Sequence, residues 1–288
     1  MDEGTRLESV RRLTPTVGSN PTPSATITLG IWSDFGYIQH MSLSARGLLF
    51  CGCIWSFMCL LIITGCFKSA ESRRQQKITQ SIENQRVIGQ AYSKFLTDNN
   101  GSYPIVRGAA GVGGKLGFAV DITGKPVPAV VATLYGATTP EKDRPLNPYI
   151  TNLKSFHDPA DAGGGAYNVA SAWKSFGNSY QPQVADDMFR VKRVLGEASE
   201  TKDSYAATSM HESEITKTSN KIIQGDWNWP YDRADAWHAK QGEARHIMLY
   251  ADGHAAEFVF PPTDKMLKWI VPPPHGNMPE PDPDYIWW

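Results

Sequence analysis

The sequence predicts an α+β protein in which an N-terminal hydrophobic segment and a long amphipathic helix precede a small antiparallel β-sheet with long loops. Three patterns predict this fold class. Residues 48–67 are apolar and uncharged, residues 69–98 keep a helical period, and residues 244–260 hold two β-prone runs around Asp252-Gly253. We expect the helix to bury its apolar stripe against one face of the sheet.

Composition narrows the function before any motif is considered. The chain has 288 residues and a formal net charge of −1, which argues against nucleic-acid binding because such proteins normally carry a basic face. The part after residue 68 is long enough for one compact domain. Its lack of cysteine excludes a disulfide framework and a cysteine-ligated metal there.

The apolar run of residues 48–67 is long enough to cross a bilayer, since twenty helical residues span about 30 Å. Residues 1–46 precede it without periodicity, and we interpret them as a disordered or untranslated extension, with Met1 and Met41 both open as the start. From Met41 the chain has the layout of a secretory signal, because a short basic region and an apolar run lead to small residues.

Three fates of this segment stay open. Ile63-Thr64-Gly65-Cys66 resembles a lipobox, so Cys66 is a candidate lipidation site. Residues 47–67 could instead remain as an uncleaved membrane span, or the chain could be cut after Gly47. The first two fates attach the protein to a membrane of the bacterial cell envelope, with the globular domain facing the periplasm or the exterior.

Residues 68–100 are predicted to form a stem helix. Its apolar stripe consists of Ile78, Ile82, Gly89, Tyr92 and Leu96, widened by Ile88, Ala91 and Phe95. Asn99-Asn100-Gly101 supplies residues that tolerate a left-handed backbone and end the helix, and Pro104 prevents its continuation.

Residues 101–262 are predicted to form a globular β domain, with a proline-rich tail at residues 263–288. The glycine-rich stretch at residues 108–117 fails as a phosphate-binding loop, because Ala109 and Leu116 stand at two required positions, and we interpret it as a flexible loop. Residues 221–227 favour a strand that runs into a loop. Asp252-Gly253 suits a type I′ hairpin turn, which needs positive φ at both central residues.

Candidate chemistry is limited. Asp226, His238 and Asp252 could hold a divalent cation, for which carboxylate ligands suit calcium, although turn geometry and hydrogen bonding explain the same residues. Ser179, His254 and Asp226 have no local context that supports a hydrolytic triad, so we expect no enzyme. A tryptophan-rich run could stack on sugars or cover the edge of a core; it contains Trp227, Trp229 and Trp237.

Several stretches match one pattern together: the apolar segment, residues 83–104, residues 144–161, the FGNSY run at residues 176–180, and residues 237–258. In this order they resemble the pseudopilin-like, prepilin-type proteins of bacterial type II secretion, and in particular the subgroup with a C-terminal His…Asp-Gly element. The resemblance covers roughly residues 47–260. It implies a pilin-like fold, a structural role, and as partners the membrane and other pseudopilins or secretion-system subunits. Some members of the family bind calcium in a loop; apart from the candidate calcium site, we expect no cofactor.

Two positions depart from the family pattern. Gly47 could precede the prepilin cleavage site, but Gly52 stands at the fifth position after it, where the family has the glutamate tied to methylation and filament assembly. Asp158 stands where relatives often have the cysteine of Cys-Pro-x-Asp, while Pro159 and Asp161 remain. The alternative function is a free-standing lipoprotein that binds a ligand such as a glycan through the tryptophan-rich loops.

Overall fold

The computed structural model describes residues 43–165, 168–262 and 281–288, with side chains from residue 69 onward. Residues 1–42, most of the predicted extension, and residues 263–280 of the predicted tail lie outside this part. Helix α1 spans Leu43–Asp98, and a compact unit comprises residues 62–288. The side chains of Gly47, Cys66 and the rest of the apolar run are not described. Within the residues whose side chains are described, no helix is long and apolar enough to cross a membrane.

The second half of α1 forms one side of the core and ends as predicted. Gly101 adopts φ +80° and donates its N–H to the Leu96 carbonyl over 2.8 Å, which closes the last turn. The buried face of the helix follows the predicted stripe and includes Ile78, Ile88, Ala91, Tyr92 and Leu96. Polar side chains interrupt this stripe between Ile78 and Ile88, which the apolar pattern did not predict.

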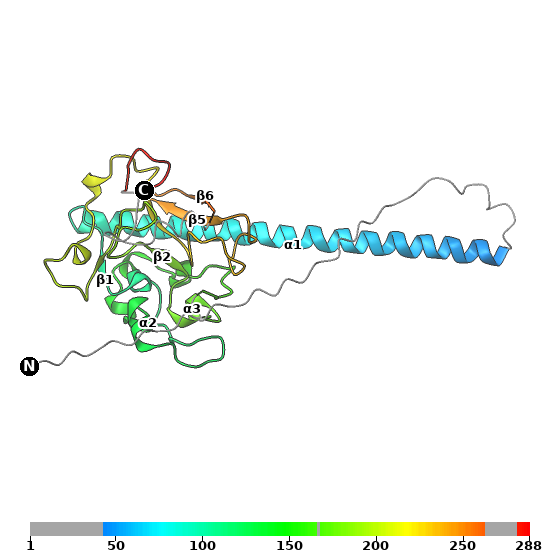
Figure 1. The fold of residues 1–288 in the computed structure, drawn as a ribbon, viewed down its shortest axis with the longest axis horizontal. Coiled ribbons are helices and arrows are strands. Elements are labelled where there is room, and N and C mark those ends of the chain that lie inside the picture. The colour runs from blue at the N-terminus through cyan, green and yellow to red at the C-terminus, as the bar shows by residue number, and fades with distance from the viewer. Residues whose placement is uncertain (1–42, 166–167, 263–280) are drawn as a thin grey trace, which may run out of the picture. The chain divides into compact units, whose positions relative to one another are not determined.

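A four-stranded antiparallel sheet lies beside α1 within the described residues, in the order β2–β4–β5–β6 (Figure 1). Its strands are β2 (Tyr180–Pro182), β4 (Ile222–Asp226), β5 (Arg245–Tyr250) and β6 (Ala255–Val259). The prediction of an α+β fold with a helix on a small antiparallel sheet and long loops is therefore confirmed.

The β5–β6 hairpin is present, but its turn differs from the predicted type I′ form. Gly253 donates its N–H to the Tyr250 carbonyl over 2.9 Å, and Tyr250 in turn donates to His254 over 3.0 Å. Gly253 has φ +84°, whereas Asp252 is not among the residues with positive φ. The hairpin therefore has a three-residue loop with one glycine in the left-handed region, in which Asp252 accepts a hydrogen bond from the His254 N–H over 3.0 Å.

Both faces of the sheet carry buried side chains, and β6 is partly exposed, with Val259 58% exposed. Ile223 and Leu249 pack with α1, as do Ala255 and the indole of Trp288. Alternate strand residues point to the opposite face, where a second cluster gathers: Phe189, Ile222, Trp229, Met248, Tyr250, Phe260 and Trp287. Trp287 and Trp288 are each 2% exposed, so residues 287 and 288 belong to the core, although the sequence placed them in a separate tail.

The remaining described chain forms loops with short elements. A two-stranded parallel pair joins β1 (Ile105–Val106) and β3 (Gly196–Glu197), and α2 (Ala129–Leu134) lies in the same cluster as α3 (Ala172–Ser175). The 3₁₀ turns are η2 (Ala109–Val112), η3 (Glu141–Asp143), η4 (Asn147–Tyr149), η5 (Leu153–Phe156), η6 (Tyr205–Ala207) and η7 (Glu212–Glu214).

The glycine-rich stretch is packed inside, so its interpretation as a flexible loop was wrong. All four residues of η2 are buried. A Cβ on Gly113 would lie 2.1 Å from the Phe156 ring, and one on Gly114 would lie 2.1 Å from the Gly177 carbonyl oxygen. The glycines therefore allow close packing of backbone against neighbouring loops rather than contact with phosphate.

Arg144 ties these loops together. Its guanidinium is completely buried and donates to five carbonyl oxygens, those of Ala110, Gly113, Gly136, Thr139 and Phe176. The distances range from 2.6 Å for Ala110 to 3.3 Å for Gly136 and Phe176. One side chain thus satisfies carbonyls from segments that form no regular ladder with one another.

Candidate functional site

A buried polar layer, which we name the polar seam, lies between α1 and the sheet. On α1 it consists of Ser81, Asn84 and Gln85, and opposite them it consists of Asp158, Tyr180, Gln224 and His238. Gln85 donates to the Ile247 carbonyl over 2.7 Å and accepts from the Gln224 amide over 3.1 Å. Hydrogen bonds therefore fix the angular position of α1 on the sheet, which apolar packing alone would fix less firmly.

Asp158 is the centre of the seam. Its Oδ2 accepts from Ser81 Oγ at 2.5 Å and contacts His238 Nε2 at 2.8 Å, while its Oδ1 accepts from the Ala160 N–H at 2.7 Å. Asp158 is 0% exposed and His238 is 1% exposed. One carboxylate thereby joins α1 to two loops that are eighty residues apart in the chain.

A second Asp–His pair lies on the sheet. Asp226, the last residue of β4, contacts His246 Nδ1 at 2.5 Å and accepts the Ile247 N–H at 3.2 Å. His246 Nε2 lies 3.0 Å from the Tyr231 carbonyl. Both side chains are almost completely buried. This pair therefore fastens the β4–β5 connection to the sheet.

The three residues proposed to hold a metal take different partners. Asp226 pairs with His246, His238 with Asp158, and Asp252 with His254 in the exposed hairpin turn. Within the part of the chain that the structure describes, no group of three His, Cys, Asp or Glu side chains is placed to hold a metal ion. These residues act in hydrogen bonding here, which is the alternative that the sequence left open.

The residues of the hypothetical triad are also separate. Ser179 Oγ donates to Asp161 over 2.7 Å, His254 stacks on Tyr250, and Asp226 is held by His246. Asp161 instead organises the loop around α3. Its carboxylate accepts hydrogen bonds from the backbone of Gly163, Ala172 and Trp173 and from the hydroxyls of Ser171 and Ser179.

The tryptophan-rich run mostly covers the core. Trp227 is 4% exposed and Trp229 5% exposed, so neither offers a free ring face for sugar stacking. Trp227 stacks on Phe176 with ring centroids 4.9 Å apart, and Tyr135 lies at the same distance. Trp237 is half-buried and donates its Nε1–H to the Gly163 carbonyl over 2.9 Å.

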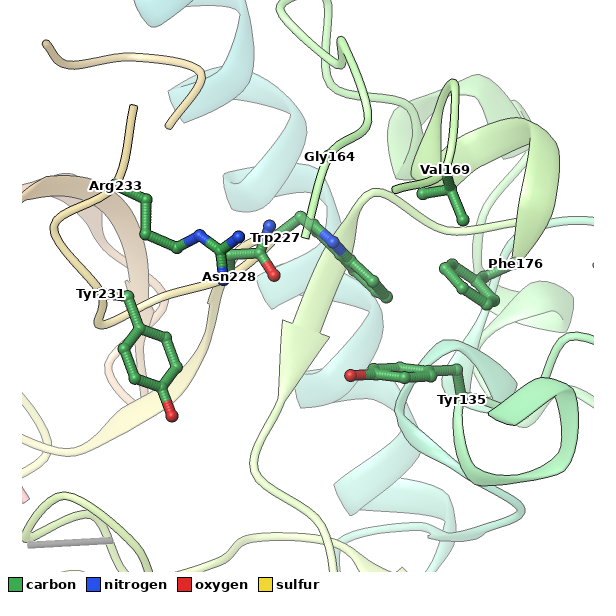
Figure 2. A pocket seen from close by; sticks show the side chains of 8 residues that line it. All are labelled: Tyr135, Gly164, Val169, Phe176, Trp227, Asn228, Tyr231 and Arg233. Atoms are coloured by element: carbon green, nitrogen blue, oxygen red, sulfur yellow. The ribbon is translucent and has the colours of Figure 1, made fainter. Parts of the chain in front are cut away.

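Beside this aromatic group lies a cavity of about 200 Å³, shown in Figure 2. Trp227, Phe176 and Tyr135 gather on one side of it, and Tyr231 and Arg233 lie on the other. The Nε1 atom of Trp227 has no hydrogen-bond partner within the described residues. Its volume is below the roughly 300–1,000 Å³ that is typical of ligand pockets.

A second cavity, of about 440 Å³, lies at the beginning of the described part of the stem. Its lining residues are Ala70, Arg73, Arg74, Lys77, Trp237 and His238. Arg74 donates to the His238 carbonyl over 2.7 Å and pairs with Glu243 at 3.0 Å. The cavity therefore lies between the first turns of the stem and the loop that carries the polar seam, and its wall is mainly basic.

The polar seam is what sequence reasoning missed. Ser81 and Gln85 follow Ile78 by three and seven residues and precede Ile88 by seven and three, so they occupy the same helical face as the apolar stripe. Polar residues at stripe positions were the available signal. Their partners, Asp158 for Ser81 and Gln224 for Gln85, come from distant parts of the chain and could not be assigned from spacing.

Stability is expected to fall as the pH rises from about 6.5 into the alkaline range. Burial lowers the pKa of both His238 and His246, but the hydrogen bonds and charges of Asp158 and Asp226 outweigh it and raise each pKa above the ordinary value. The folded state thus binds these protons more tightly than the unfolded chain does. The resulting stability is complete below the unfolded pKa of about 6.5 and is lost as the pH passes through the folded pKa values.

Urea unfolding across this pH range measures the effect. The variant with both His238→Gln and His246→Gln should show a flatter pH dependence than the native chain. The control is His254→Gln, which changes an exposed histidine in the hairpin turn and should keep the native slope. A native profile that rises between these pH values would contradict the assignment.

Comparison of the chain with known protein families, with curated proteins and with solved structures finds no match.

Proposed function

We propose that the protein is a membrane-anchored, envelope-facing structural or accessory subunit of a type II secretion or pilus-like system, similar to the pseudopilins. The observation that carries the proposal is α1 itself. One helix, Leu43–Asp98, includes both the apolar run and the face on which the sheet packs. An apolar segment followed directly in the sequence by a helix that packs in the core of the soluble domain is the arrangement that a pilin-like subunit requires.

The polar seam supports this proposal mechanically. A stem that transmits force or position between a bilayer and a domain must not rotate or slide against that domain. Ser81, Asn84 and Gln85 make hydrogen bonds with groups of the loops and of β5, and such bonds have a defined geometry along and around the helix axis. These hydrogen bonds therefore hold the globular domain firmly on the stem helix, as an anchored subunit requires.

The family's filament-forming role is not part of the proposal. Gly52 provides no carboxylate at the position where the family uses glutamate during assembly. The proposal is limited to an anchored domain whose stem packs with other subunits at the membrane surface. Anchoring takes place either through the retained apolar span or through a lipid on Cys66.

Carbonate extraction of membranes tests the anchor. The native chain should stay in the pellet, whereas Leu60→Lys together with Leu61→Lys should release it, because each lysine at the centre of a span costs about 2.5–3.5 kcal/mol. The control adds the same charge on the exposed face of the same helix, through Gln75→Lys and Gln90→Lys, and should remain in the pellet. A native chain found in the soluble fraction would rule out the anchor.

Two further measurements complete the test. The mass of the mature N-terminal peptide distinguishes cleavage after Gly47, a lipidated Cys66 and an intact span. Affinity purification of the native chain from detergent-solubilised membranes should recover pseudopilin-type or other secretion-system subunits. Recovery of none of these, from a chain that is anchored, would leave the membrane attachment standing and remove the role in secretion.

A further inference from the structure

Two basic side chains that line the cavity beside the stem are available to bind an anionic ligand. Arg73 and Lys77 both line it, are exposed, and are separated by four residues, so they lie on one face of α1 one turn apart. Neither forms an ion pair or side-chain hydrogen bond within the described residues. The acidic groups nearby, Glu71 and Glu243, lie 3.7 Å and 3.0 Å from the guanidinium of Arg74 instead.

His238, which also lines this cavity, has a buried ring nitrogen without a partner among the described residues. The residue is 1% exposed, and its Nε2 is held by Asp158. The other ring nitrogen, Nδ1, has no hydrogen-bond partner in the part of the chain that the structure describes. A neutral ring accepts a hydrogen bond there from a hydroxyl, and a charged ring donates one to a phosphate oxygen, so in either state the atom can bind a polar headgroup.

The position of the cavity along the chain indicates that a membrane lipid supplies the headgroup. This step rests on the proposed function, in which the apolar run ends at Phe67 in the membrane. Arg73 follows Phe67 by six residues, or about 9 Å along a helix. The polar layer on each side of a bilayer is about 5–8 Å thick, so Arg73 would lie just above the lipid phosphates. Lys77 lies one turn further, about 15 Å beyond Phe67, and its side chain tilts back toward the N-terminal, membrane end of the helix.

Trp237 forms an aromatic wall of the cavity that suits the interfacial part of a lipid. Its indole lines the cavity, while its Nε1 is already bonded to the Gly163 carbonyl. The ring therefore offers an apolar surface, and tryptophan is enriched at the interface between headgroups and acyl chains. The site therefore combines three features. Arg73 and Lys77 can bind a phosphate, the Nδ1 atom of His238 can bind a hydroxyl, and the Trp237 ring forms an apolar wall.

We propose that this cavity binds the headgroup of an anionic glycerophospholipid, with the phosphate between Arg73 and Lys77 and a headgroup hydroxyl at His238. The bound lipid fixes the height and orientation of the head above the membrane. It joins the first turns of the stem to the loop that also holds the polar seam.

Native mass spectrometry of the full chain tests the proposal. The protein is held in neutral detergent micelles that contain equal amounts of phosphatidylglycerol and phosphatidylcholine, and the retained lipid is identified. The native chain should retain phosphatidylglycerol preferentially. The variant with Arg73→Gln and Lys77→Gln should bind it about 10–30-fold more weakly, since each basic residue near a membrane surface contributes a factor of about five.

The control variant carries Arg86→Gln and Lys94→Gln, which remove the same charge from exposed positions further along α1. It should retain phosphatidylglycerol as the native chain does. His238 is left unchanged because it belongs to the polar seam, and circular dichroism confirms that both variants are folded. Equal loss in the two variants would mean general charge attraction and would overturn the proposal.

Competition with inorganic phosphate distinguishes a lipid headgroup from free phosphate as the ligand of the cavity. When it is added as a competitor, it should displace little phosphatidylglycerol, because it lacks the hydroxyl and the acyl chains. Complete displacement at concentrations near those of the lipid would assign the cavity to free phosphate and overturn the lipid assignment. A chain that extracts from membranes with carbonate would disprove the anchor, whereas an anchored chain without lipid preference would disprove this inference alone.

Discussion

Replacing Arg144 with methionine is expected to lower the free energy of unfolding by about 3–5 kcal/mol, and this is among the largest effects of any single substitution in the chain. The guanidinium serves five carbonyl oxygens, and methionine leaves all of them without that donor. Each buried acceptor without a partner costs about 1–3 kcal/mol before relaxation. The loops would relax and recover part of this cost, so the total falls below the sum.

The conservative variant separates charge from shape. Burial lowers the pKa of Arg144 to about 10, so the group is charged at neutral pH, and Arg144→Lys keeps that charge. A single ammonium has three donors and cannot reach five carbonyls spread around a planar fork. We therefore expect Arg144→Lys to be nearly as destabilising as Arg144→Met.

Chemical unfolding followed by tryptophan fluorescence measures both variants. The control is Arg86→Met, which removes an exposed arginine that pairs with Glu83 at 3.7 Å. It should change the stability by less than about 0.5 kcal/mol. If Arg144→Met and Arg86→Met were equally stable, the loops would not depend on the buried guanidinium.

Replacing Asp158 with alanine is expected to cost a similar amount, about 3–5 kcal/mol, for a different reason. The substitution leaves Ser81 Oγ, the Ala160 N–H and the ring of His238 without their shared acceptor, at a position with no access to water. Because His238 has lost the carboxylate that raises its pKa, the variant should also lose part of the pH dependence described above.

The chain contains a matched control for this experiment. Asp252 and His254 form the same kind of pair at 2.5 Å, but in the exposed hairpin turn. Asp252→Ala should cost about 1 kcal/mol or less, because water replaces the lost partner. Equal costs at the two positions would show that burial of the Asp158 pair adds nothing, and the polar seam would then be a minor contributor to stability.

Several parts of the structure could be predicted because local chemistry decides them. The end of α1 follows from Asn99-Asn100-Gly101, whose backbone tolerates positive φ, and Asn100 and Gly101 do adopt φ of 52° and 80°. The hairpin position follows from two β-prone runs around Asp252-Gly253. The type of turn could not be predicted, because the loop length depends on the register of β5 with β6. The residues of the turn alone do not fix that register.

The candidate site was less predictable. Asp226 and His238 were recognised as candidate site residues, but their pairings were not. His238 pairs with Asp158, eighty residues away in the chain, and Asp226 pairs with His246, twenty residues away. The glycine-rich stretch resembled a flexible loop by composition. Its burial depends on Phe156 and Arg144, which pack against it only once the chain has folded.

By itself the sequence determined the apolar segment, the helix period, the end of the helix and the hairpin, because each depends on residues within one or two turns of one another. Only the tertiary structure decided which polar groups share the polar seam, which loops Arg144 joins, and that Trp287 and Trp288 lie in the core. Those arrangements depend on desolvation. A buried donor or acceptor must find a partner wherever the folded chain places one, and sequence distance has no part in that choice.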